Sequence, residues 1–262
     1  MQTNFTKNSL LLLLTLVFCS AGTINAQEAK VEEDGKNLVK WNFGALALKN
    51  YSFQYERAIG KKISAAVGVR FAPKSNIPFK SNVEKLIDDE ETWNSIKDFK
   101  TGNFAITPEV RFYTGKGVFR GFYVAPFARY AKYNAEVPFN FEVEVTNGTN
   151  TITREEQINL SGDVTALTGG LLFGAQWKLS KLVYLDWWIL GASYGTSKGN
   201  ISGKSASGFD DDEQEALRDA LKDLEDLPLV KVKSEVNAEG AKVDFDGPWA
   251  NLRAGLSIGF RF

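Results

Sequence analysis

The sequence predicts an all-β protein, an eight-stranded antiparallel up-and-down transmembrane β-barrel formed by residues 38–262. Three observations lead to this prediction. Short segments alternate between apolar and polar side chains, the connections between them are alternately short and long, and the apolar side of the segments is rich in large aromatic residues. All three are properties of β-barrels that cross a bacterial outer membrane.

The alternation is clearest in the last segment, residues 252–262, LRAGLSIGFRF. Every second residue from Leu252 to Phe262 is apolar, and the residues between them are Arg, Gly or Ser. A period of two residues is that of a β-strand with one apolar and one polar face. The terminal Phe260 and Phe262 resemble the C-terminal assembly signal that the barrel assembly machinery recognises, so this machinery is an expected partner.

Seven further segments show the same alternation. They span residues 38–48, 51–58, 63–71, 104–113, 121–133, 164–179 and 182–195. The connections after the second, fourth and sixth segments are short, and those after the third, fifth and seventh (72–102, 134–163 and 197–248) are long. Short turns on one rim and long loops on the other are typical of outer-membrane barrels, and closing the sheet removes its edges. We therefore expect three long extracellular loops.

A soluble carrier barrel also alternates, but its apolar face lines the cavity. The apolar face of this chain carries ten large aromatic residues: Trp41, Phe43, Tyr51, Phe53, Tyr55, Phe112, Trp177, Trp187, Phe260 and Phe262. The interior of an eight-stranded barrel is only just wide enough for side chains to fill it, so this set would overfill it. We therefore expect the aromatic face to contact outer-membrane lipid.

The polar faces carry charges that would point into the barrel. The predicted interior charge cluster consists of Lys40, Glu56, Glu109, Arg111, Arg129, Asp186 and Arg253, and Arg70, Lys178 and Arg261 share the inward phase. Because a charge kept from water needs a partner, we expect the three acids to pair with neighbours such as Arg111, Lys40 and Arg129. Two interpretations stay open: a salt-bridged plug, or a charged gate of an anion-preferring pore.

Two of the long loops contain helical patterns, at residues 82–98 and 210–227. The second pattern carries nine acidic residues, whose spacing does not match the EF-hand, so a solvated helix face is the simpler interpretation. Whether this acidic segment, 210–226, binds a cation stays open. In the remaining long loop, 134–163, residues 138–160 alternate around Asn147-Gly148, which predicts a β-hairpin.

The first 26 residues resemble a secretory signal peptide, with Lys7 ahead of an apolar run at 10–19 and a cleavage point after Ala26. A short polar segment, 27–37, would then precede the barrel. Cys19 could instead be a lipid anchor, but the preceding Phe18 is not small. We expect Cys19 to be removed with the signal, which leaves no thiol chemistry.

The chain holds 31 basic and 32 acidic residues, so it has no strong field for nucleic acid. It has no histidine, which excludes the histidine bases of the barrel lipases and acyltransferases that we considered, and leaves zinc without histidine or cysteine ligands in the barrel. We expect neither an enzyme nor a cofactor or metal site. An acid–acid pair in the loops is the exception that spacing alone does not exclude.

Three stretches, KWNFGALALKNYSFQYERAIGKKISAAVG, ITPEVRFYTGKGVFRGFYVAPFARY and LRAGLSIGFRF, resemble a domain-of-unknown-function family of small outer-membrane barrels. The overall pattern is similar to barrels of the OmpA/OmpX/OmpW type. The resemblance implies the fold and the bacterial cell outer membrane, but no activity. We expect a structural or surface-interaction barrel whose loops contact an unknown partner. The alternative is a narrow pore for small solutes, and the ligand and oligomeric state stay open.

Overall fold

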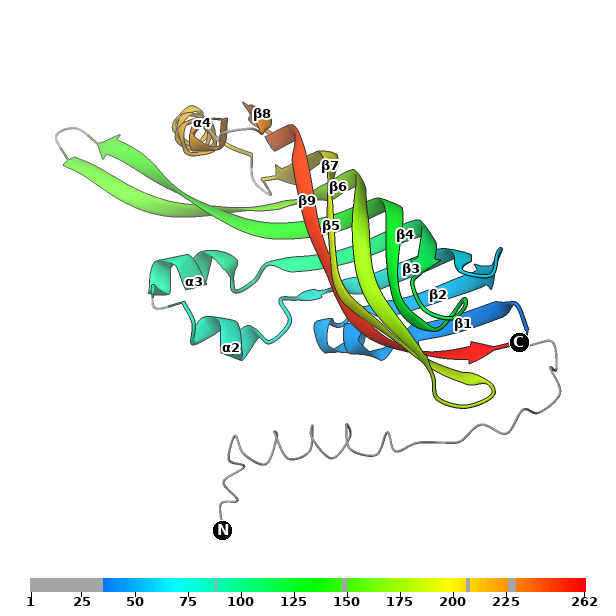
Figure 1. Ribbon diagram of the computed structural model, residues 1–262. Helices are drawn as coiled ribbons and strands as arrows, with labels where there is room; N and C mark the ends of the chain where they lie inside the picture. Colours follow the sequence, from blue (N-terminus) through cyan, green and yellow to red (C-terminus); the bar gives the residue numbers. More distant parts are fainter. Residues whose placement is uncertain (1–34, 88, 148–149, 206–207, 226–229) are drawn as a thin grey trace, which may run out of the picture. The chain divides into compact units, whose positions relative to one another are not determined.

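The computed structural model describes residues 35–262 except 88, 148–149, 206–207 and 226–229 (Figure 1). The signal peptide expected at 1–26 and residues 27–34 of the polar segment lie outside the described residues. The barrel predicted from residue 38 onward falls within them.

Nine strands and a few short helices make up the described chain. The strands are β1 (Asn37–Asn42), β2 (Tyr51–Ala58), β3 (Ile63–Asn76), β4 (Lys100–Tyr113), β5 (Gly121–Asn147), β6 (Asn150–Lys178), β7 (Val183–Lys204), β8 (Lys231–Asn237) and β9 (Gly240–Arg261). The helices are η1, a 3-10 helix (Phe43–Leu48), α2 (Lys80–Glu84), α3 (Glu90–Ile96) and α4 (Asp211–Glu225). None of the helices in the described residues is long and apolar enough to cross a membrane.

The strands close into a ring. Each of β1 to β6 pairs antiparallel with the next strand, β7 pairs with β9, and β9 pairs with β1 from Leu38↔Arg261 to Asn42↔Ser257. The ninth strand, β8, pairs with β9 outside this ring. The predicted eight-stranded antiparallel barrel is therefore confirmed.

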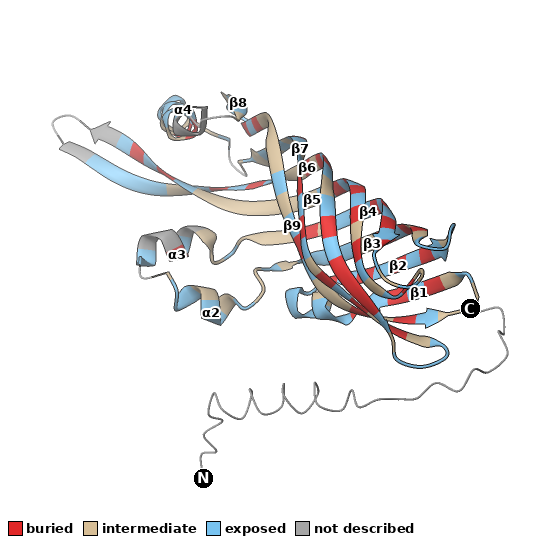
Figure 2. Cartoon of the chain, in the orientation of Figure 1, coloured by how far each residue is buried: buried red, intermediate tan, exposed pale blue. Residues whose placement is uncertain are grey.

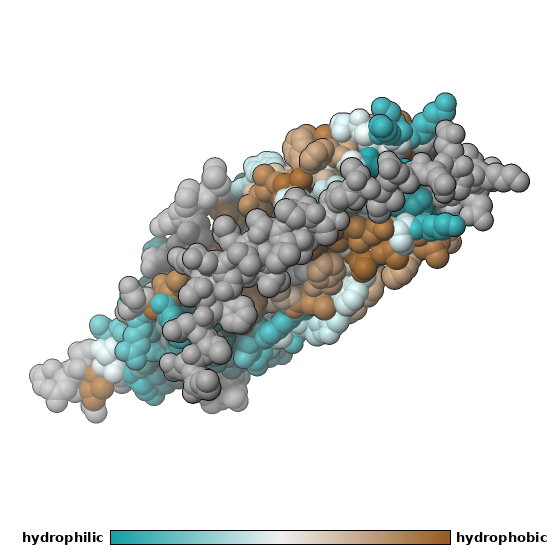
Figure 3. Space-filling view, turned by 60° about the horizontal axis from the view of Figure 1, so that its bottom comes forward, coloured by the Kyte–Doolittle hydropathy of each residue, from teal (hydrophilic) through white to brown (hydrophobic). Residues whose placement is uncertain are grey.

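The two faces of the wall differ as predicted. Inward-facing residues are buried along the strands of the ring, as the red bands of Figure 2 show, and all ten aromatics predicted on the outside are exposed. Hydrophobic residues gather on the visible outside of the barrel in Figure 3. A sheet with an apolar outside and a polar, filled inside suits lipid rather than water.

The first predicted strand, 38–48, is too long. β1 ends at Asn42, whose side chain accepts a hydrogen bond from the backbone N–H of Ala45 at 3.1 Å and caps η1. Lys49 ends η1 in the left-handed region, at φ 54°. The apolar spacing of residues 43–48 suits a strand and a 3-10 turn equally, so the local pattern did not show where pairing stops.

The prediction that Ile189 of β7 faces outward was also wrong. Leu190, not Ile189, pairs with the exposed Phe173, because the β6–β7 register shifts between Phe173 and Gly174. The extra residue forms a β-bulge, which reverses the alternation beyond it.

The hairpin predicted at 138–160 is confirmed, but it is not a separate unit in a loop. β5 and β6 stay paired from the barrel up to Asn147↔Asn150, so most of the predicted loop 134–163 is continuous strand (Figure 1). The helical pattern at 82–98 gives two short helices, α2 and α3, instead of one.

The helix predicted at 210–227 is confirmed as α4. The N–H of Glu213 donates to Asp210 Oδ1 at 2.8 Å, and the N–H of Asp210 donates to Glu213 Oε2 at 3.0 Å, which forms a reciprocal cap. The apolar stripe of α4 is buried at Leu217 and Leu221. It packs against side chains of the extended strands: Phe141, Val143, Ile158, Leu160, Ala241 and Val243. The extension above the barrel therefore has its own small core.

We expect Leu217→Ala to loosen this extension without unfolding the barrel. Removing a buried leucine side chain costs about 2–5 kcal/mol, which here comes from the local opening of α4. Hydrogen exchange of α4 amides should accelerate accordingly, while the exposed neighbour Arg218→Ala leaves it unchanged. Equal exchange in both variants would show that α4 is not held by this core.

Candidate functional site

All seven residues of the predicted interior cluster point into the barrel, and each is at most 7% exposed. They come from six strands: Lys40 (β1), Glu56 (β2), Glu109 and Arg111 (β4), Arg129 (β5), Asp186 (β7) and Arg253 (β9). Five of them, Lys40, Glu56, Glu109, Arg111 and Asp186, form one bonded network that we call the charge layer. Arg129 and Arg253 lie nearer the long-loop rim and, with Arg70, form a second group that we call the arginine layer.

Arg111 is the centre of the charge layer. Its guanidinium donates to Asp186 Oδ2 at 2.7 Å, to Glu109 Oε1 at 2.6 Å and to Gln54 Oε1 at 2.8 Å. It also lies 4.4 Å from the ring centre of Tyr123. The guanidinium is therefore fully engaged and fills the barrel axis with a planar group.

Lys40 completes the network. Its ammonium donates to Asp186 Oδ2 at 2.5 Å and forms an ion pair with Glu56. Glu56 also accepts hydrogen bonds from the hydroxyls of Ser64 and Tyr113. Every charge of the layer thus has a partner of opposite sign, which is the condition under which buried ion pairs persist.

An apolar floor closes the barrel on the short-turn rim. Phe119, in the connection between β4 and β5, is fully buried and packs edge-on against Tyr113 and Tyr184. Arg261 lies with its guanidinium 5.1 Å from the Phe119 ring and donates to the Tyr184 hydroxyl at 2.7 Å. Phe119 was not predicted as an interior residue, although the apolar pair Val118-Phe119 within an otherwise polar turn is a signal that could have indicated it.

The arginine layer has few acidic partners. Arg253 donates to Glu109 Oε2 at 3.2 Å, whereas Arg70 donates to the amide oxygen of Asn50 at 2.7 Å. The prediction that Arg129 pairs with an acidic residue is wrong. Its guanidinium donates to the hydroxyl of Thr107 at 3.2 Å, and no acid within the described residues forms an ion pair with it. Glu109, the nearby acidic residue, is already paired with Arg111 and Arg253.

A cavity of about 510 Å³ lies at the arginine layer. Its lining includes Arg70, Arg129, Arg253 and Trp188, but no member of the charge layer. The open part of the lumen therefore ends where the charge layer begins, and the floor lies beyond.

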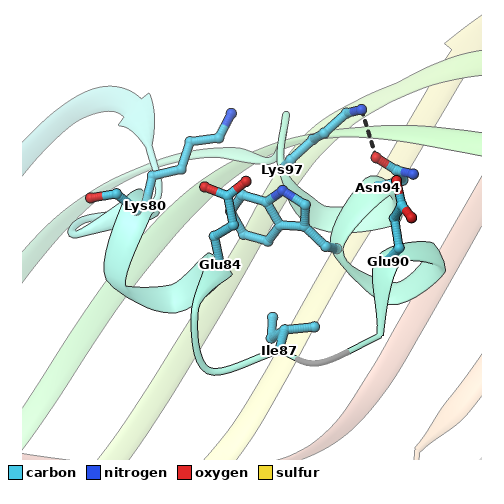
Figure 4. Close-up of a pocket in the computed structure, with 8 residues that line it drawn as sticks. Lys80, Glu84, Ile87, Glu90, Asn94 and Lys97 are labelled. Atoms are coloured by element: carbon cyan, nitrogen blue, oxygen red, sulfur yellow. Dashed lines mark hydrogen bonds between the residues drawn. The ribbon is translucent and has the colours of Figure 1, made fainter.

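A second hollow, about 880 Å³, lies between α2 and α3 outside the barrel (Figure 4). Lys80 and Glu84 come from α2, and Asn94 and Lys97, joined by a hydrogen bond of 2.8 Å, come from α3 and the residue that follows it. Side chains of both charges border this hollow, and its lining residues do not place a nucleophile beside a base. These residues therefore do not point to a particular ligand.

No group of three or more Asp, Glu, His or Cys side chains that could hold a metal ion exists in the described part of the chain. The side chains of Asp223, Glu225 and Asp226, part of the acidic segment 210–226, are not among those described. Phe260 and Phe262, the predicted assembly signal, are exposed at the C-terminal end of β9. The N–H of Phe262 donates to the carbonyl of Asn37 at 2.9 Å and ties this end to β1.

A family model for DUF3575, described as a protein of unknown function, matches residues 11–200. The chain belongs to the DUF3575 family. That description assigns no activity to the interior cluster, and no curated protein matches the chain.

Among solved structures, the chain is similar to the N-terminal β-barrel domain of Pseudomonas aeruginosa OprF, with 8% identity, a TM-score of 0.25, and coverage of 87% of this chain and 98% of that one. It is also similar to the translocator domain of the autotransporter NalP from Neisseria meningitidis, with 10% identity, a TM-score of 0.27, and coverage of 97% and 96%. The strand pairing given above, rather than these likenesses, establishes the fold.

Proposed function

We propose that this DUF3575 protein is a bacterial outer-membrane barrel with a closed lumen, whose role is structural or lies in surface interaction through the rim of long connections. The observation that carries the proposal is the filled interior: the charge layer and the Phe119 floor follow one another along the axis. A barrel closed in this way acts through its outer surface and its rim, not through its lumen.

The apolar outside supports the membrane location. Exposed aromatics surround the barrel, its polar residues are turned inward, and the charges of the charge layer are paired, which suits a wall in contact with lipid (Figure 2). Outer-membrane lipid is then the partner of the wall, and the barrel assembly machinery is the proposed partner of the β9 end at Phe260 and Phe262.

The extension supports a surface role. It is a built structure with its own core, and ion pairs such as Arg154–Glu213 at 2.5 Å join the β5–β6 hairpin to α4. A surface held in one conformation loses less conformational entropy when it binds a partner than a flexible loop does. The chemistry of that partner stays open.

An enzyme is not part of this proposal, because the interior carboxylates are all engaged by cations and the chain has no histidine. The alternative, a narrow pore for small solutes, draws support from the open cavity at the arginine layer. It requires that the charge layer and the floor move aside.

Cysteine labelling tests the topology. The chain's one cysteine is Cys19, ahead of the barrel, so Lys233→Cys in β8 and Lys181→Cys in the β6–β7 turn each introduce a single thiol into it. In intact cells a membrane-impermeant maleimide should label the variant at 233, and should label the variant at 181 only after the outer membrane is permeabilised. The reverse pattern would place the extension in the periplasm and contradict the proposal.

Removing the extension tests the surface role. Residues 138–159 and 205–239 can be replaced by Asn-Gly turns, because Val137↔Leu160 and Lys204↔Gly240 are already paired strand residues. The truncated barrel should reach the outer membrane but fail to restore surface phenotypes in a strain lacking the gene. If it restores all of them, the extension is dispensable and the surface role is wrong.

A further inference from the structure

The barrel wall is interrupted beside η1. β9 pairs with β1 only from Ser257 onward, and with β8 only up to Asp246. Among the described residues, the stretch of β9 between them, 247–256, therefore has a strand on one edge alone, that of β7. η1 stands where β1 would have continued, so the wall here is a short helix instead of a strand.

The cavity at the arginine layer reaches this interruption. Its lining combines residues of both faces of the wall: Leu190 and Leu252, which are 53% and 72% exposed on the lipid side, and Arg129 and Arg253 on the inside. In a continuous wall these two sets are separated by the backbone, because successive side chains point to opposite faces. The cavity is therefore a lateral portal between the lumen and the lipid-facing surface.

The inner end of the portal is rich in positive charge. Its lining brings together Arg70, Arg129 and Arg253, and the carboxylate of this region, Glu109, is shared with Arg111. Arg129 is only 5% exposed, yet its Nε has no hydrogen-bond partner among the described residues. A buried guanidinium left without an anion is costly, so this end is suited to receive one.

We propose that the portal binds one anionic amphiphile, a long alkyl chain with a carboxylate or phosphate head. The head group accepts hydrogen bonds from Arg129 and Arg70, for which planar guanidinium donors are well shaped. The alkyl chain leaves through the wall and lies against Leu48, Leu190 and Leu252. A cavity of about 510 Å³ accommodates the head and the first part of the chain.

The portal has a cationic inner end and an apolar outer opening, and a ligand must match both. A small inorganic anion would pair with the guanidinium of Arg129 and leave the apolar opening unused. A neutral lipid would cover the opening and leave the buried Arg129 without an anion. The same head-group chemistry can come from a membrane lipid phosphate or from a free fatty acid. The proposal goes beyond the surface role, since it involves no residue of the extension.

Native mass spectrometry of the full mature chain in a non-ionic detergent tests the proposal with four probes: dodecanoate, dodecyl phosphate, dodecanol and inorganic phosphate. We expect one bound molecule of at least one of the two anionic amphiphiles, and at least tenfold weaker binding of dodecanol and of inorganic phosphate. Preference for dodecanoate indicates a fatty acid, and preference for dodecyl phosphate indicates a lipid head group. Equal binding of dodecanol or of inorganic phosphate, or no binding of either amphiphile, overturns the proposal.

Two pairs of variants locate the site. Arg129→Gln should weaken amphiphile binding at least tenfold, whereas Lys132→Gln, an exposed cation on the same strand that pairs with Asp163, should not. Ala254→Trp should narrow the portal from the lipid side and weaken binding, whereas Ala128→Trp, at an exposed position of β5 that does not line the portal, should not. If Arg129→Gln does not fold, the alanine pair decides, and unchanged binding in Ala254→Trp overturns the lateral route.

Discussion

Asp186→Ala is expected to lower the free energy of unfolding of the barrel by about 3–5 kcal/mol, because it leaves two buried cations without their shared partner. Asp186 Oδ2 accepts hydrogen bonds from Lys40 at 2.5 Å and from Arg111 at 2.7 Å, and its Oδ1 accepts one from Tyr123 at 2.8 Å. Since the side chain is fully buried, water does not replace these bonds.

Urea unfolding in lipid vesicles, followed by tryptophan fluorescence, measures this loss. Asp163→Ala is the matched control, because Asp163 forms an exposed ion pair with Lys132 at 2.7 Å, and such pairs contribute about 0–1 kcal/mol. The double variant Asp186→Leu with Lys40→Met should recover most of the lost stability, since it removes opposite charges together. A stability loss below 1 kcal/mol for Asp186→Ala would mean that the charge layer is solvated.

Phe119→Ala is expected to destabilise the barrel by about 3–5 kcal/mol, the usual cost of removing a fully buried phenylalanine ring. The ring fills the short-turn end against Tyr113 and Tyr184, and it supports the guanidinium of Arg261. Its removal leaves a cavity that strands of a closed barrel cannot collapse to fill.

The same unfolding assay measures this effect, with the exposed Arg120→Ala as the control in the same connection. We expect the control to change stability by less than about 0.5 kcal/mol. Phe119 also holds a positive φ of 64°, so Phe119→Gly separates backbone relief from ring packing. If Phe119→Ala equals the control, the floor does not contribute to the fold.

The eight strands of the ring and the face of most of their residues were predictable, because both follow from local alternation. The strand β8, which lies within the predicted loop 197–248, was not predicted. A period of two residues assigns Leu252 to one face and Arg253 to the other without knowledge of the partner strands, and the excess of aromatics on one face indicates lipid. For the same reason the inward position of Arg111 and Asp186 could be read from the sequence.

What the sequence did not show depends on contacts between distant segments. The end of β1 at Asn42 follows from the helical cap and from where pairing with β9 stops. The bulge at Ile189 depends on the register between β6 and β7. The lack of an acidic partner for Arg129 depends on Glu109 being paired with Arg111 and Arg253. The lateral portal combines two such features, the early end of β1 and the absence of an acidic partner for Arg129 among the described residues. No local sequence motif therefore predicts it.

Single-channel recording in planar bilayers tests the closed lumen most directly. The wild-type barrel should show no steady conductance above the bilayer baseline, whereas the double variant Arg111→Ala with Phe119→Ala, which empties the charge layer and the floor together, should conduct. A steady wild-type conductance that Glu109→Ala or Arg111→Ala abolishes would contradict the account and make the charge layer the lining of a pore.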